Sequence, residues 1–123
     1  MHKPESIEQG SSFDLVALER ELRLDGQYER SGHTARTLVR TSDLRVVLMV
    51  MKGQSSIPEH QADETASVQV LSGRVRLRVP SRDVELRSGE LFVLGASLRH
   101  GVKALEDSAF LLTLAWSDKA DPP

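Results

Sequence analysis

The chain contains no cysteine among its 123 residues. This absence excludes disulfide bonds, thiolate metal ligands and cysteine nucleophiles. The chain also lacks an excess of one charge sign, because 16 lysines and arginines stand against 18 aspartates and glutamates, for a formal net charge of -2. A nucleic-acid-binding protein normally carries a basic excess or patch, so the composition predicts no nucleic-acid partner.

Long apolar runs are missing too. The longest covers residues 46–51, whereas a membrane-spanning helix needs about 20 apolar residues, so we expect no membrane association. Residues 1–12, MHKPESIEQGSS, are polar and lack the apolar core of a secretory signal. We therefore expect a cytoplasmic protein. The hydrophobic share of 39% and the charged share of 28% fit one globular domain.

One short N-terminal helix is predicted over residues 12–24. Phe13, Leu15, Leu18 and Leu22 fall on one helical face, Ser12 is placed to cap the start, and the pair at 25–26 marks the end. Such a short helix is not stable alone and must pack on the rest of the domain. The predicted organisation is a flexible leader (1–11), a single domain (12–117) with a β-barrel over about 35–117, and a flexible tail (118–123).

The rest of the domain is predicted to be β-structure. The clearest strand is 74–79, where arginines alternate with Val75, Leu77 and Val79, the period of a strand with one wet face. Further strands are predicted over 37–41, 44–51, 67–71, 84–86, 91–94, 100–104 and 109–116, with residues 54–59 in a loop. Short strands at intervals of about 8–12 residues, separated by turn residues, predict an all-β sandwich or barrel.

The arginine stripe on strand 74–79 has two interpretations. Arg74, Arg76 and Arg78 could form an anion-binding face, or they could be a solvated strand face whose aliphatic stems cover apolar surface. Glu85 and other acidic residues are close by in the sequence, and they would weaken a grip on phosphate. The sequence therefore favours the solvated face.

Residues 44–115 resemble the cupin family. The first cupin motif runs from a glycine through a loop to a His-x-His pair, a glutamate and a second glycine, and here its places are taken by Gly53, residues 54–59, His60 and Gly73. The second motif is matched by Gly89, residues 90–94, residues 95–97 and His100. The resemblance implies a double-stranded β-helix, the jelly-roll RmlC-like cupin barrel, commonly a homodimer, with a ligand pocket inside one end.

Two of the family's metal ligands are absent. The second motif histidine would fall on Ala62, and the glutamate would fall on Ala66 or Ser67, which leaves His60 and His100. A tight divalent site needs about three or four donors. We therefore expect either no cofactor or a weakly bound Zn, Fe, Mn or Ni ion at these two histidines. An oxygen from Asp63, Glu64, Gln61 or Gln69 could complete such a site.

A ligand pocket without a metal is the other possibility. If Ala66, Val68 and Val70 point inward, the pocket wall is apolar, as in most small-molecule sites. The residues predicted to bind the ligand are His60, His100, Gln69, Met49 and Phe92. Strand register decides whether Met51 and Trp116 lie on the same wall, and Met49 and Phe92 could equally fill the core.

Three functions remain open from the sequence. The first is a small cupin that binds a small organic ligand, with His60 and His100 as polar anchors. The second is a metal-dependent dioxygenase or isomerase acting on a small organic acid or aromatic. The third is a non-catalytic, dimeric sensing module. One imidazole could act as a general base, but the sequence assigns no catalytic residue and leaves open whether the protein is an enzyme.

Overall fold

The computed structural model describes residues 9–115, which hold two helices and nine strands. Trp116, the predicted tail and most of the predicted leader lie outside these residues. The elements are α1 (Leu15–Arg23), α2 (Gly26–Ser31), β1 (His33–Arg40), β2 (Arg45–Met51), β3 (Ser56–Gln61), β4 (Ala66–Ser72), β5 (Arg74–Val79), β6 (Arg82–Arg87), β7 (Leu91–Leu94), β8 (Arg99–Ala104) and β9 (Ser108–Leu114). Within the described part, no helix is long and apolar enough to cross a membrane.

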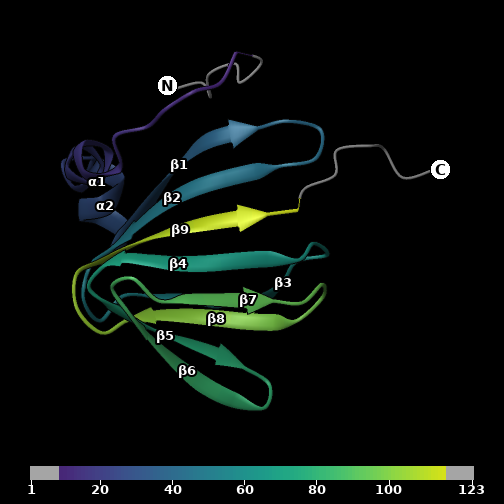
Figure 1. Cartoon of the computed structure of the whole chain (residues 1–123). Helices are drawn as coiled ribbons and strands as arrows, with labels where there is room; N and C mark the ends of the chain where they lie inside the picture. Colours follow the sequence, from purple (N-terminus) through teal and green to yellow (C-terminus); the bar gives the residue numbers. More distant parts are fainter. Residues whose placement is uncertain (1–8, 116–123) are drawn as a thin grey trace.

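The strands form two antiparallel sheets that face each other. The five-stranded sheet has the order β1-β2-β9-β4-β7, and the four-stranded sheet has the order β3-β8-β5-β6. Consecutive strands repeatedly cross from one sheet to the other, as β4 to β5 and β8 to β9 do in Figure 1. This is a double-stranded β-helix of the jelly-roll type, which confirms the predicted all-β fold.

The space between the sheets is filled by side chains of one parity on each strand. On β5 the valine and leucine positions point inward and are buried, while Arg76 and Arg78 on the other face are exposed. On β4 the inward set is Ala66, Val68 and Val70, all buried. The period-two pattern in the sequence therefore identified both the strand and its inner face.

The N-terminal segment holds two helices rather than the one predicted. Asp14, not Ser12, caps α1, because its side chain accepts a hydrogen bond from the Ala17 amide at 3.1 Å. Asp25 follows the end of α1, as predicted, and it also caps a second helix, because its side chain accepts from the Gln27 amide at 2.8 Å. A helix as short as α2 leaves too few turns for an apolar period to appear in the sequence.

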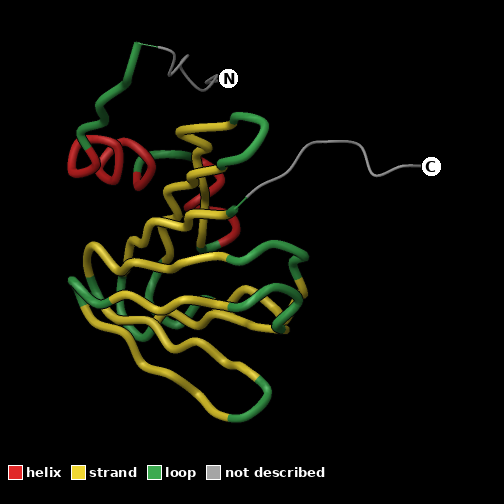
Figure 2. Tube along the Cα trace, turned by 45° about the vertical axis from the view of Figure 1, so that its right-hand side comes forward, coloured by secondary structure: helices red, strands yellow, loops and turns green. Residues whose placement is uncertain are grey.

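Both helices pack on the outside of the five-stranded sheet. Leu22 of α1 and Tyr28 of α2 are buried in a second apolar cluster with Leu48 and Val50, which point away from the barrel interior. Figure 2 shows the helices beside the first two strands, far from the β5–β6 hairpin. The helices thus cover the β1–β2 side of the molecule and leave the barrel interior to the strands.

Residues 54–59 were predicted as a loop, but most of them belong to β3. This strand lies at an edge of the four-stranded sheet, where Pro58 is tolerated because an edge strand does not need every amide. The register shifts between Ile57, opposite Val102, and His60, opposite His100. Two residues of β3 therefore face one residue of β8, which defines a β-bulge. The extra residue interrupts the alternation of inward and outward side chains, so the strand was not visible in the sequence.

Candidate functional site

His60 and His100 lie directly opposite each other on neighbouring strands. They form one register pair of the β3–β8 ladder, and paired residues of an antiparallel ladder point to the same face. Their ring centroids are 4.3 Å apart, and the ring planes meet at 60° in an edge-to-face arrangement. Two histidines forty positions apart in the sequence are thus in contact in the fold.

The pair lies where the barrel interior meets solvent. On β8, His100 has the same parity as Val102 and Ala104, which are buried in the core, and His100 itself is only 7% exposed. His60 belongs to the edge strand β3 and is exposed. One imidazole is therefore held inside the barrel wall, and the other lies open to a molecule arriving from outside.

The backbone holds both rings through the same ring nitrogen, Nδ1. The Nδ1 atom of His60 lies 3.2 Å from the carbonyl oxygen of Pro58, and the Nδ1 atom of His100 lies 3.0 Å from that of Leu98. A carbonyl oxygen can only accept, so each Nδ1 carries the proton and donates. In a neutral ring, Nε2 is then left with its lone pair, as a hydrogen-bond acceptor or a metal ligand.

The residues around the pair do not fit a tightly bound metal ion. Ala62 and Ala66 stand where further ligands were expected, and neither Asp63 nor Glu64 joins the histidines. In residues 9–115, no group of three or more His, Cys, Asp or Glu is placed to hold a metal. Gln61 pairs with Arg99 on the opposite face of the β3–β8 ladder, so its amide does not join the histidines from that position. Two imidazole nitrogens supply about half of the ligands that a complete metal site needs.

The other predicted pocket residues divide between two faces. Met49 and Phe92 are partly buried and pack against the barrel core, on the same interior as the inward-pointing His100. Gln69 is exposed and alternates with the buried Val68 and Val70, so its side chain is on the outer face of β4. The structure therefore brings four of the five predicted ligand residues to the barrel interior or its rim and places Gln69 outside.

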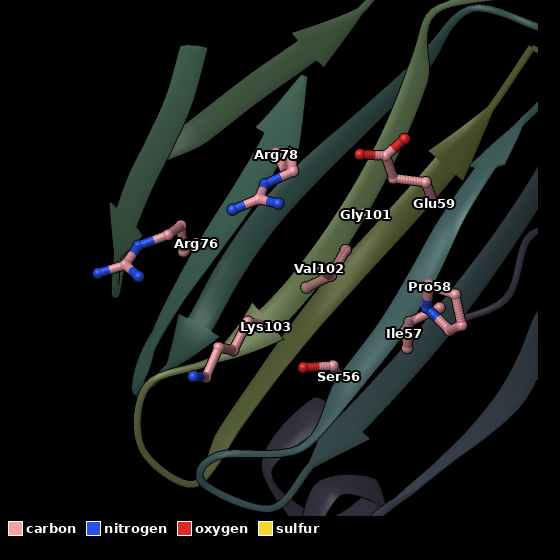
Figure 3. Close-up of a pocket in the computed structure, with 9 residues that line it drawn as sticks. All are labelled: Ser56, Ile57, Pro58, Glu59, Arg76, Arg78, Gly101, Val102 and Lys103. Carbon is pink, nitrogen blue, oxygen red and sulfur yellow. The ribbon is translucent and has the colours of Figure 1, made fainter. Parts of the chain in front are cut away.

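A concave surface lies outside the barrel, on the arginine face for which the sequence favoured simple solvation over anion binding. It has a volume of about 320 Å³ and runs along the outer faces of β3, β8 and β5. Its polar lining is drawn in Figure 3 and comprises Ser56, Glu59, Arg76, Arg78 and Lys103, with Gly101 at the centre. We call this surface the basic groove. The arginine alternation was its signal in the sequence, but the contribution of Lys103 depends on strand register.

Comparisons with known proteins agree with this architecture. The family model for the cupin domain matches residues 46–116. A conserved protein of unknown function from Streptococcus pyogenes is similar in structure, with a TM-score of 0.74, 23% identity, and coverage of 96% of this chain and 97% of that one. No match is found among curated proteins.

Two further solved structures extend the similarity. An RmlC-like cupin from Shewanella frigidimarina gives a TM-score of 0.67 at 16% identity, covering 72% of this chain and 80% of that one. A variant of salicylate 1,2-dioxygenase from Pseudoaminobacter salicylatoxidans gives a TM-score of 0.73 at 14% identity. The match covers 84% of this chain but only 34% of that one. At these identities the likeness shows the fold alone.

Proposed function

The chain belongs to the cupin-domain family, and on that premise we propose that it binds a small, partly apolar organic molecule at the rim of the barrel. In this proposal His60 and His100 are the polar anchors. The observation that carries it is the orientation of the two rings, 4.3 Å apart, each with Nδ1 bonded to a backbone carbonyl. Both Nε2 atoms are then available to the same ligand.

The chemistry of the anchors selects the kind of ligand. Two neutral imidazoles that present Nε2 lone pairs are hydrogen-bond acceptors, so the ligand must supply donors such as hydroxyl or amine groups. Two such bonds contribute only about 1–3 kcal/mol in total. Contact with the apolar side chains of Met49 and Phe92 must therefore supply most of the affinity, at about 25 cal/mol per Å² of apolar surface buried.

The proposal is tested on protein purified without an affinity tag, by native mass spectrometry and metal analysis of the same sample. We expect a small organic molecule to stay bound to the wild-type protein and to be lost from His60→Ala and His100→Ala. His33→Ala is the matched control, because it removes the same side chain from the start of β1, and it should retain the molecule.

Three results would overturn the proposal. Retention of the molecule by folded His60→Ala and His100→Ala proteins would show that the histidines do not anchor it. Iron, manganese, nickel or zinc at close to one ion per chain would instead favour the metal-dependent enzyme. If either variant fails to fold while His33→Ala folds, that histidine is a structural core residue.

A further inference from the structure

The basic groove is a second site, distinct from the histidine pair. We propose that it binds a small molecule through a dianionic oxyanion, with a phosphate group as the model. The groove occupies the outer face of β8, on which Gly101 and Lys103 lie, whereas His100 and Val102 point to the interior. A ligand in the groove would therefore not touch the imidazoles.

Two cations in the groove form no ion pair in the part of the chain that the structure describes, although Glu85 of β6, which pairs with Arg74 and Arg87, is the register partner of Arg76. Arg76 of β5 and Lys103 of β8 are directly opposite each other in the ladder, and Figure 3 shows their side chains next to each other. Within the described residues, neither has a carboxylate within 4.0 Å. Like charges directly opposite each other destabilise a sheet. An anion between them would remove that cost.

The remaining arginines of the same face are already paired. Arg74 lies 3.9 Å from Glu85 and 3.6 Å from Glu106, and Arg87 also reaches Glu85 at 3.8 Å. Here the unbalanced pair coincides with the concave part of the surface, which is what an anion site requires.

Gly101 and the bulge of β3 create the hollow. A Cβ atom at position 101 would come within 3.3 Å of the Glu59 amide nitrogen and the Ile57 carbonyl oxygen, so a larger residue would have to push the β3 backbone by a few tenths of an ångström. Arg78 stands beside the floor and is held at 3.4 Å by Asp83, which leaves part of its guanidinium free. A guanidinium can donate two parallel hydrogen bonds and a lysine ammonium adds a compact positive charge, and together they suit the oxygens of a phosphate.

The charge balance of the lining sets the ligand's charge. Among the lining residues, Arg78 is paired with Asp83 and Glu59 with Arg99, so the surplus of two positive charges belongs to Arg76 and Lys103. Glu59 is itself engaged by Arg99 at 3.7 Å, at the rim of the groove. A dianion matches the surplus, and a monoanion such as chloride would leave half of it.

The test is a titration of the full chain with inorganic phosphate and, separately, with succinate, at constant ionic strength and at a pH where both are dianionic. Backbone amide shifts of Gly101 and Lys103 are followed by NMR. We expect saturable shifts at these positions and about a tenfold or greater loss of affinity in Arg76→Gln and in Lys103→Gln, because each removes a charge-assisted hydrogen bond. Arg87→Gln, with the same charge change on β6 outside the groove, should keep wild-type affinity.

The two ligands distinguish the source of the oxyanion. Saturation by phosphate identifies a phosphate ester, and saturation by succinate alone identifies a dicarboxylate; either supports the groove as a site. Shifts that never saturate with either anion overturn the proposal. An equal loss of affinity in Arg87→Gln would also overturn it, because the effect would then belong to the protein's overall charge.

Discussion

The turn between β4 and β5 permits a quantitative prediction. Gly73 adopts a φ of 81°, and the start of β9 packs against it, so that an added Cβ would overlap the Asp107 carbonyl oxygen and the Ser108 hydroxyl. In Gly73→Ala, the left-handed backbone costs about 1–2 kcal/mol. The overlap with buried neighbours adds about 1–3 kcal/mol. We expect a total loss of roughly 2–5 kcal/mol in the free energy of unfolding.

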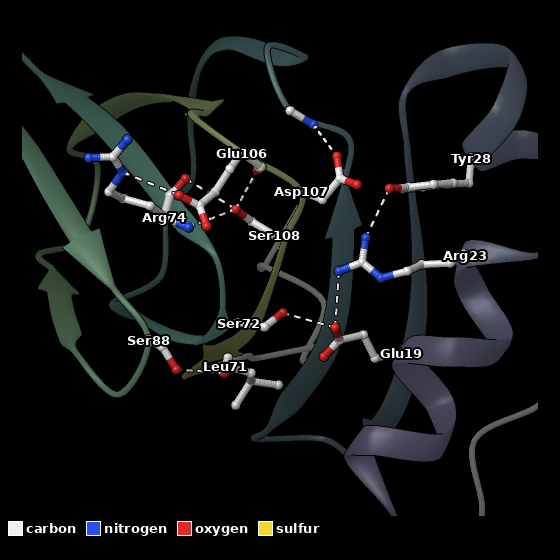
Figure 4. A network of polar contacts seen from close by, with 11 residues as sticks. Glu19, Arg23, Tyr28, Leu71, Ser72, Arg74, Ser88, Glu106, Asp107 and Ser108 are labelled. Carbon is white, nitrogen blue, oxygen red and sulfur yellow. Dashed lines mark hydrogen bonds and ion pairs between the residues drawn. The ribbon is translucent and has the colours of Figure 1, made fainter.

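The overlap is costly because Ser108 cannot move freely. Its hydroxyl is completely buried, accepts from the Arg74 amide at 2.9 Å, and is placed to donate to the carbonyl oxygens of Arg74 and Glu106 (Figure 4). Displacing it would leave the Arg74 amide without an acceptor, which itself costs about 1–3 kcal/mol. The turn glycine and the β9 serine therefore form one tightly packed unit.

Gly89→Ala is the matched control for the same measurement. Gly89 has a φ of 89°, yet nothing lies within 4 Å of an added Cβ. Urea unfolding of the two variants should therefore separate backbone strain, about 1–2 kcal/mol in both, from the packing cost, which only Gly73→Ala carries. Equal losses in the two variants would refute the reasoning, because the contact with Ser108 would then contribute nothing.

Two further predictions concern the helices and the assembly. Glu19, 20% exposed, accepts from Arg23 at 3.0 Å and from Ser72 at 2.9 Å, so Glu19→Ala should lose about 1–3 kcal/mol of stability in urea unfolding. Glu21→Ala breaks the ion pair to Arg36, but the Glu21 side chain is 60% exposed, so this variant should lose less than about 1 kcal/mol of stability. A larger loss in Glu21→Ala than in Glu19→Ala would contradict the role of Glu19 in holding α1 against β4. We also expect a homodimer that covers Leu91 and Val93, each 58% exposed on the edge strand β7. Light scattering should give twice the mass of one chain for the wild type and a lower mass when both are changed to serine; a wild-type monomer at micromolar concentration would contradict it.

The parts of the fold that could be predicted are those with a repeating physical signal. The alternation on residues 74–79 set the strand, its inner face and its solvent face, because burial on one side of a sheet imposes a period of two. The meeting of His60 and His100 followed from the family resemblance and not from any periodicity, and the structure places them as a register pair.

The parts that could not be predicted depend on local capping or on tertiary register. Asp25 marks the end of α1 as predicted, but the sequence did not show that it also caps a second helix, because Asp suits a turn and an N-cap equally. The strand β3 was hidden by Pro58 and its bulge. The outward position of Gln69 follows from its alternation with the inward Val68 and Val70, so its prediction as a ligand residue did not agree with that pattern. The opposition of Arg76 to Lys103 depends on pairing between distant strands, which one sequence does not reveal.

The central claim is that two imidazoles share the barrel rim with both Nε2 atoms unprotonated and available. Nitrogen-15 NMR of the histidine rings tests it most directly, because it reports which ring nitrogen carries the proton and which rings are close. The account predicts the Nδ1–H form for both His60 and His100 in the neutral state, with proton contacts between the two rings. An Nε2–H form at either position, or no contact between the rings, would contradict it.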